Sequence, residues 1–154
     1  MYYLLLSFHS LIRWFVLFSL LLSLYMALKG LVSKRMFSPL VNTVRHWTAT
    51  IAHIQLMMGI TIYFQSPVVK YAALNTENTM INDGIFFRYL HISLMFIAVV
   101  FITIGSAKAK RMTTDAEKYR TMLRWFTAGL IVILLAIPWP FYEYVSRPLI
   151  RRFQ

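Results

Sequence analysis

The chain has 154 residues, of which 59% are hydrophobic and only 14% are charged. Soluble globular domains carry about 25% charged residues, so this composition indicates a membrane protein. Sixteen Lys and Arg against five Asp and Glu give a formal net charge of +11. In a membrane protein we assign such an excess to cytoplasmic loops, and we expect no nucleic-acid partner. The chain has no cysteine, which excludes disulfides, thiolate metal sites, iron–sulfur clusters and covalently attached haem.

Four apolar stretches are each long enough to cross a lipid bilayer as a helix. They cover residues 3–28, 44–65, 85–107 and 121–141. Gly30 and Pro39 bracket the first connection, and Ser66-Pro67 ends the second helix. Short connections favour antiparallel packing of consecutive helices. The sequence therefore predicts an all-α fold, in which residues 1–154 form one transmembrane domain, an integral membrane up-down four-helix bundle that contacts membrane lipid.

Basic residues are distributed unevenly among the connections. The first connection, residues 29–43, and the third, residues 108–120, are rich in Lys and Arg, and we count the nearby Arg45 with them. The second connection, residues 66–84, is polar but carries few basic residues. Lys and Arg are enriched in cytoplasmic loops. We therefore expect residues 29–43 and 108–120 to be cytoplasmic, with residues 66–84 and both termini outside.

Three histidines and one arginine lie well inside the predicted spans: His9, Arg13, His53 and His91. The other histidine and arginines of these spans lie within three residues of a span end. Ionisable side chains inside a membrane are costly, so they indicate a functional site. His9 and Arg13 are one helical turn apart and share a helix face. With a helical rise of about 1.5 Å per residue, His9 and His91 lie at matching depth near the outer side. His53 lies nearer the middle of the membrane.

Two neutral imidazoles at matching depth on different helices can ligate the iron of a haem b from both sides. We therefore predict one haem b near the outer side, with His9 and His91 as axial ligands and His53 as the alternative ligand. None of the five acidic residues falls inside a span, so haem propionates are a suitable anionic partner for Arg13. Arg88 lies one turn before His91 and is a second candidate contact for a propionate.

Other interpretations of these residues stay open. The histidines could form a polar cluster that holds helices together, and Arg13 could extend toward the membrane surface. At the level of function, the chain could be a haem-free accessory or assembly subunit of a larger membrane complex, with Arg13 paired to a carboxylate of another chain. A small transporter or metal permease that uses the histidines is the third alternative.

Several short motifs touch all four predicted spans. They are His9-Ser-Leu-Ile-Arg13-Trp14, His53-Ile-Gln55-Leu-Met-Met-Gly59, Arg88-Tyr-Leu-His91-Ile-Ser-Leu-Met95 and Ile137-Pro138-Trp139-Pro140-Phe141. In these motifs the chain resembles a family of small four-helix bacterial membrane proteins labelled b-type cytochromes. The resemblance implies haem b and electron transfer. In that family we expect an acidic residue just before the third-span histidine, where this chain has Leu90.

The positive-inside pattern and the resemblance together indicate a multi-pass protein of the bacterial inner membrane. We expect one-electron transfer by an electron-transfer protein, not a self-contained enzyme. A quinone is a candidate redox partner, and other membrane or redox subunits are candidate protein partners.

Overall fold

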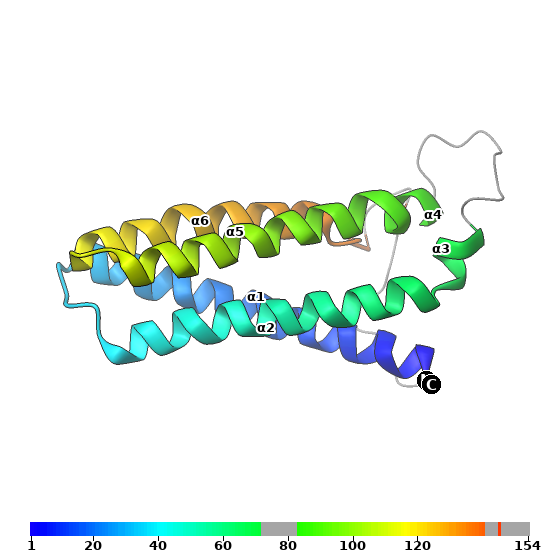
Figure 1. The fold of residues 1–154 in the computed structure, drawn as a ribbon, viewed down its shortest axis with the longest axis horizontal. Helices are drawn as coiled ribbons and strands as arrows, with labels where there is room; N and C mark the ends of the chain where they lie inside the picture. Colours follow the sequence, from blue (N-terminus) through cyan, green and yellow to red (C-terminus); the bar gives the residue numbers. More distant parts are fainter. Residues whose placement is uncertain (72–82, 141–144, 146–154) are drawn as a thin grey trace.

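The computed structural model describes residues 1–71, 83–140 and 145, and all regular secondary structure in them is helical. The all-α prediction is thus confirmed for the described part of the chain. Four of the helices are long, and Figure 1 shows them lying side by side. They are α1 (Tyr2–Val32), α2 (Pro39–Gln65), α5 (Ile92–Arg111) and α6 (Asp115–Ala136). The shorter elements are α3 (Pro67–Tyr71), α4 (Asp83–Ile85) and a π-helix, η1 (Phe86–His91), which continues directly into α5.

Each long helix packs against two of the others. Helix α1 contacts α2 and α6, and α5 contacts the same two helices. Helices α1 and α5 therefore lie diagonally opposite each other, which places His9 and His91 on opposite sides of the interior. Fully buried Leu20, Ile102 and Phe126 belong to the core that holds the four helices together.

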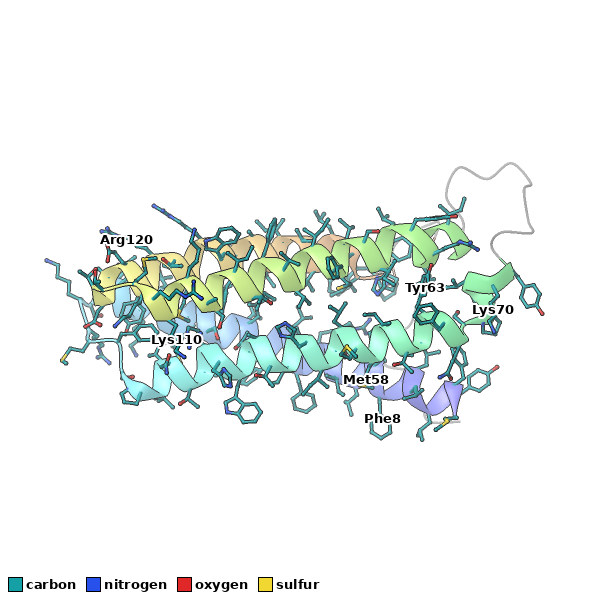
Figure 2. The ribbon with its side chains drawn as sticks, viewed as in Figure 1. Phe8, Met58, Tyr63, Lys70, Lys110 and Arg120 are labelled. Atoms are coloured by element: carbon teal, nitrogen blue, oxygen red, sulfur yellow. The ribbon has the colours of Figure 1, made fainter. Side chains whose placement is uncertain are left out.

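The outer faces of the helices carry large apolar side chains. On α1 they recur every three or four residues, as at Phe8, Leu11, Phe15 and Phe18, which are 41%, 40%, 57% and 67% exposed. Figure 2 shows Phe8 pointing away from the other helices. Among the described residues, three helices are long and apolar enough to cross a membrane: Tyr2–Val32, Phe86–Arg111 and Asp115–Ala136. Helix α2 is equally long, but its first half contains several polar residues.

Arg45 differs from the expectation drawn from the sequence, which grouped it with the basic residues of the first connection. It lies inside α2 and is only 4% exposed. Its Nη1 donates hydrogen bonds to the carbonyl oxygen and to the Oγ of Ser106 on α5, and its Nη2 donates to Oδ1 of Asn42 at 2.8 Å. A buried charge is tolerated only when it is hydrogen-bonded. Because the partner Ser106 belongs to α5, these bonds link α2 to α5.

The first helix is longer than predicted, because Gly30 is part of α1 and does not end it. Gly30 is buried, and a Cβ at this position would overlap the ring of Tyr119 on α6. Helix α1 instead ends after Val32, where Lys34 adopts a left-handed conformation with φ of 47°. The N–H of Arg35 donates to the Gly30 carbonyl at 2.9 Å, which is the hydrogen bond of a Schellman motif.

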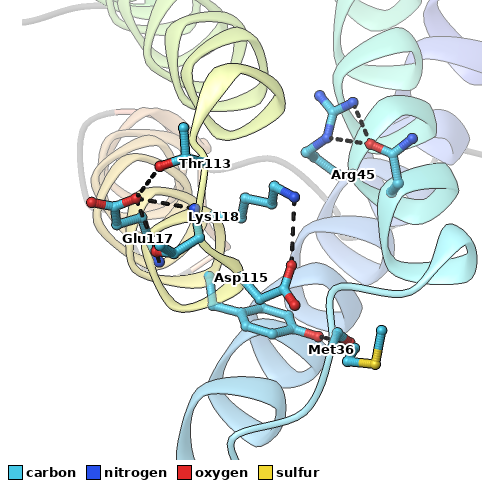
Figure 3. Close-up of polar contacts among 9 residues, drawn as sticks. Met36, Arg45, Thr113, Asp115, Glu117 and Lys118 are labelled. Carbon is cyan, nitrogen blue, oxygen red and sulfur yellow. Dashed lines mark hydrogen bonds and ion pairs between the residues drawn. The ribbon is translucent and has the colours of Figure 1, made fainter.

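Local capping residues set the starts of the other helices. Helix α2 begins at Pro39, with the Ser38 side chain accepting from the N–H of Val41 at 3.3 Å. Helix α6 begins at Asp115, six residues before the predicted start at residue 121, because Thr114 and Glu117 form a reciprocal capping box. Figure 3 shows this cap beside the ion pair of Lys118 with Asp115.

The fourth helix also ends earlier than the predicted residue 141. The last residue of α6 is Ala136, two residues before Pro138. A proline restricts the preceding residue to extended conformations, and Ile137 is extended with ψ of 129°. The Ala136 carbonyl therefore lies at a helix end, free of the usual bond within the helix and available to another group.

Replacing Gly30 by Ala should destabilise the protein by about 1–3 kcal/mol, because the added methyl group meets the Tyr119 ring in a filled core. Thermal unfolding in detergent measures this change. Lys29→Ala, at the exposed neighbouring position, is the control and should leave the unfolding temperature nearly unchanged. A Gly30→Ala protein as stable as the wild type would contradict the close packing of α1 against α6.

The predicted orientation can be tested with single cysteines, because the chain has none of its own. Lys70 and Lys110 are exposed at opposite ends of the molecule, as Figure 2 shows. In cells with a permeabilised outer membrane, a membrane-impermeant maleimide should label Lys70→Cys. It should label Lys110→Cys only after the inner membrane is also permeabilised. The cysteine-free wild type controls for background, and the reverse labelling pattern would invert the orientation.

Candidate cofactor site

A cavity of about 180 Å³ lies among α1, α2, η1, α5 and α6. A single water needs only about 10–15 Å³ of such space, so this cavity can hold something much larger than one water. Most of its wall is apolar, formed by side chains such as Leu56, Met95 and Val99. The polar side chains in the wall are those of Tyr2, His9, Ser10, Arg13, Gln55, Tyr63, Ser66 and His91. Three of the five predicted site residues, His9, Arg13 and His91, thus line one cavity.

His9 enters the cavity wall from α1 and lies against α2. The contact is close because α2 has a glycine there: a Cβ on Gly59 would be 3.2 Å from Cε1 of His9. The backbone carbonyl of His9 accepts a hydrogen bond from Nε2 of Gln55 at 2.8 Å. Nδ1 of the His9 ring is buried and has no hydrogen-bond partner within the described residues.

His91 is the last residue of η1, and its orientation is fixed by the end of α6. Nδ1 of His91 lies 2.8 Å from the carbonyl oxygen of Ala136. A carbonyl can only accept, so Nδ1 must carry the proton and Nε2 keeps its lone pair. The rings of Phe86 and Phe87 lie 5.9 and 5.7 Å from the His91 ring. The Ala136 carbonyl therefore orients the His91 imidazole. The preceding residue, Leu90, has no polar side chain that could do so.

The π-helical turn matters for the direction in which His91 points. In a π-helix the hydrogen bonds skip one more residue than in an α-helix, so side chains before and after it differ in register. Such turns are frequent at functional sites. Here the turn runs from Phe86, which is 1% exposed, to His91. It allows Phe86 to pack inside and His91 to face the cavity within one continuous helix.

Arg13 lies one turn after His9 on α1 and contributes to the same wall. Its guanidinium carbon is 5.4 Å from the centre of the Trp14 ring. His9, Arg13 and His91 line the same cavity. No acidic side chain occurs among the described residues that line the cavity. Arg13 therefore contributes a cation to the polar side of this wall, and a guanidinium can bind a carboxylate.

The other histidines and Arg88 lie outside the cavity wall. His53 is exposed on α2, with Nδ1 2.7 Å from the Ala49 carbonyl and Nε2 3.2 Å from Oγ1 of Thr103. Arg88 donates from Nη1 to the Val69 carbonyl at 3.2 Å, which ties η1 to α3. His46 is exposed beside Trp47. The structure therefore brings His9, Arg13 and His91 together and separates His53 and Arg88 from them.

Gln55 is one of the polar cavity residues that the sequence analysis did not assign to the haem site, although it is a candidate hydrogen-bonding group for a quinone. The available signal was that Gln55 lies one helical turn before Gly59, so both share one face of α2. At the end of the cavity near the N-terminus, Tyr2 OH donates to Oγ of Ser66 at 3.3 Å. This bond joins the start of α1 to the junction between α2 and α3.

Within the described ranges, no group of three or more His, Cys, Asp or Glu side chains is placed to hold a bare metal ion. A porphyrin supplies four ligands itself, so its iron needs only two from the protein. The residues around the cavity fit such a group: two imidazoles, an apolar wall and a cation for carboxylates.

No family model, no curated protein and no solved structure matches this chain. The resemblance to b-type cytochromes therefore rests on the short motifs alone.

Proposed function

We propose that this protein is a b-type cytochrome, an integral membrane up-down four-helix bundle that holds one haem b between its helices. One observation carries the proposal. His9 and His91 come from diagonally opposite helices and line the same largely apolar cavity, together with Arg13. The helix contacts and the apolar outer faces support the bundle and its place in the membrane.

In this proposal His9 and His91 are the two axial ligands. The hydrogen bond to Ala136 leaves Nε2 of His91 with a free lone pair, which is what a metal ligand needs. His53 is the weaker alternative, because both of its ring nitrogens already lie near hydrogen-bonding groups outside the cavity. With both axial positions filled by protein, substrates have no open position on iron, which favours electron transfer over catalysis.

Arg13 would hold the propionates of the bound group. Its planar guanidinium matches carboxylates in a bidentate manner, and it lines the same wall as the two histidines. The apolar side chains exclude water and surround the flat faces of the group. When bound, haem b supplies a one-electron redox couple, whose potential the protein sets through the two histidines and the surrounding polarity.

The basic residues of the first and third connections support an orientation with this end of the bundle outside. The proposed location is the bacterial inner membrane, and a membrane quinone is the proposed class of redox partner.

Purified protein should show the sharp α and Soret bands of a six-coordinate haem b in a reduced-minus-oxidised spectrum. A pyridine haemochrome assay should give about one haem per chain, because one pair of histidines lines the cavity. His9→Ala and His91→Ala should each lose most of the bound haem. His46→Ala and His53→Ala are matched controls from α2 and should retain it.

Two outcomes would contradict this proposal. The first is folded wild-type protein without visible bands, even when haem is supplied during expression. The second is full haem content in both the His9→Ala and the His91→Ala protein. Loss of haem in His53→Ala with retention in His9→Ala would instead move the ligand to His53.

Replacing Arg13 by Gln should weaken haem binding about 10- to 100-fold, because a hydrogen bond to a charged group contributes about 1.5–3 kcal/mol. Titration of haem into the haem-free protein measures the affinity. Arg13→Lys should fall between the wild type and Arg13→Gln, because lysine keeps the charge but not the bidentate geometry. Arg88→Gln is the control: this side chain binds Val69 and lies outside the cavity wall. Equal losses for Arg13→Gln and Arg88→Gln would contradict the special role of Arg13.

A further inference from the structure

Two side-chain atoms stand out in the part of the chain that the structure describes. They are Nδ1 of His9 and Oε1 of Gln55, the buried side-chain nitrogen and oxygen that have no hydrogen-bond partner. Both residues line the same cavity, His9 from α1 and Gln55 from α2. Buried polar atoms are nearly always satisfied in folded proteins, so two unsatisfied atoms on neighbouring side chains require an explanation.

The orientation of the Gln55 amide is fixed by its other end. Nε2 donates to the backbone carbonyl of His9 at 2.8 Å. Because a carbonyl only accepts, the amide nitrogen must face it, and Oε1 remains as an acceptor. The His9 ring lies against the same face of α2, next to Gly59, one turn after Gln55. The side chain of Gln55 is thus hydrogen-bonded to the backbone of His9, and Nδ1 of the His9 ring also lacks a partner.

We propose that Gln55 is the positioning residue of His9, holding its backbone carbonyl through Nε2 and accepting a hydrogen bond from its ring Nδ1–H through Oε1. Neither atom has a partner in this structure, so the second bond requires the two side chains to rotate toward each other, in the haem-free protein as well as in the haem-loaded one. The bond requires the proton on Nδ1, so Nε2 is left as the bare nitrogen. Gln55 thereby sets the tautomer that a metal ligand needs. The part of this inference that concerns haem binding and its potential rests on the proposed function.

The two histidines would then be oriented in the same way by different kinds of group. His91 uses the backbone carbonyl of Ala136, which no side-chain substitution removes. His9 uses a side chain, and Gln55 is therefore the position where the strength of an axial ligand can be changed. A carboxylate there would draw the Nδ1 proton more strongly and make the ring a better donor to iron.

The first experiment needs no haem. The haem-free protein is labelled with ¹⁵N-histidine, and ring nitrogen shifts report which nitrogen of each histidine carries the proton. His9 should be the Nδ1–H tautomer in the wild type and should lose this preference in Gln55→Leu. Gln65→Leu, a glutamine on the exposed end of α2, is the matched control and should leave His9 unchanged.

The signals of His91 report whether each variant is folded, because its bond to Ala136 is independent of Gln55. An Nε2–H tautomer at His9 in the wild type would overturn the inference. Unchanged His9 signals in Gln55→Leu, with normal His91 signals, would overturn it as well.

The second experiment uses the haem-loaded protein and measures its midpoint potential. Gln55→Glu should shift the potential downward, because a more electron-rich imidazole stabilises oxidised iron. Gln55→Leu should shift it upward, and Gln65→Leu should leave it unchanged. Shifts in opposite directions are not expected from loosened packing alone.

If haem binds but both Gln55 variants keep the wild-type potential, the proposed role of Gln55 is wrong while the proposed function stands. If the wild type takes up no haem, the proposed function fails, and the ¹⁵N measurement still decides the role of Gln55.

Discussion

The need to satisfy polar groups inside an apolar helix assembly is the constraint on which this structure depends. Arg45 meets it by donating to Ser106 across the α2–α5 contact. Ser23 and Thr48 meet it with a 2.7 Å bond between their hydroxyls across the α1–α2 contact. These bonds fix the helices in one arrangement. Against this background, Nδ1 of His9 and Oε1 of Gln55 are exceptions among the described residues, because both are buried without a partner.

The long helices could be predicted from the sequence, because runs of apolar residues longer than a membrane is thick leave few alternatives. Their ends were harder to place. Gly30 has the residue type of a helix terminator, yet its lack of a side chain serves close packing against Tyr119. The start of α6 depends on the reciprocal bonds of Thr114 and Glu117, which extend the helix through a stretch that is polar in composition. The end of α1 depends on packing against a distant residue, and the start of α6 depends on local hydrogen bonds. The periodicity of apolar residues predicts neither.

Part of the cavity wall could also be predicted. Depth along a helix follows from a constant rise, so the matching levels of His9 and His91 were accessible from the sequence. The direction in which a side chain points depends on rotation of the whole helix, which weakly amphipathic apolar segments do not specify. Sequence reasoning therefore grouped His53 and Arg88 with the site, whereas the structure turns them away from the cavity. The π-helical turn that ends at His91 changes the side-chain register, and no pattern of residues in the sequence predicted this turn.

The contacts between helices also bear on assembly in the membrane. Helices α1 and α2 form one antiparallel hairpin, α5 and α6 form another, and the cavity lies where the two hairpins meet. His9 belongs to the first hairpin and His91 to the second. Because the cavity is lined by residues of both hairpins, it forms only when the two hairpins dock. A group bound by both histidines bridges the hairpins, so its binding free energy adds to that of their docking. Supply of that group during biogenesis would then control how much of the chain reaches its final arrangement.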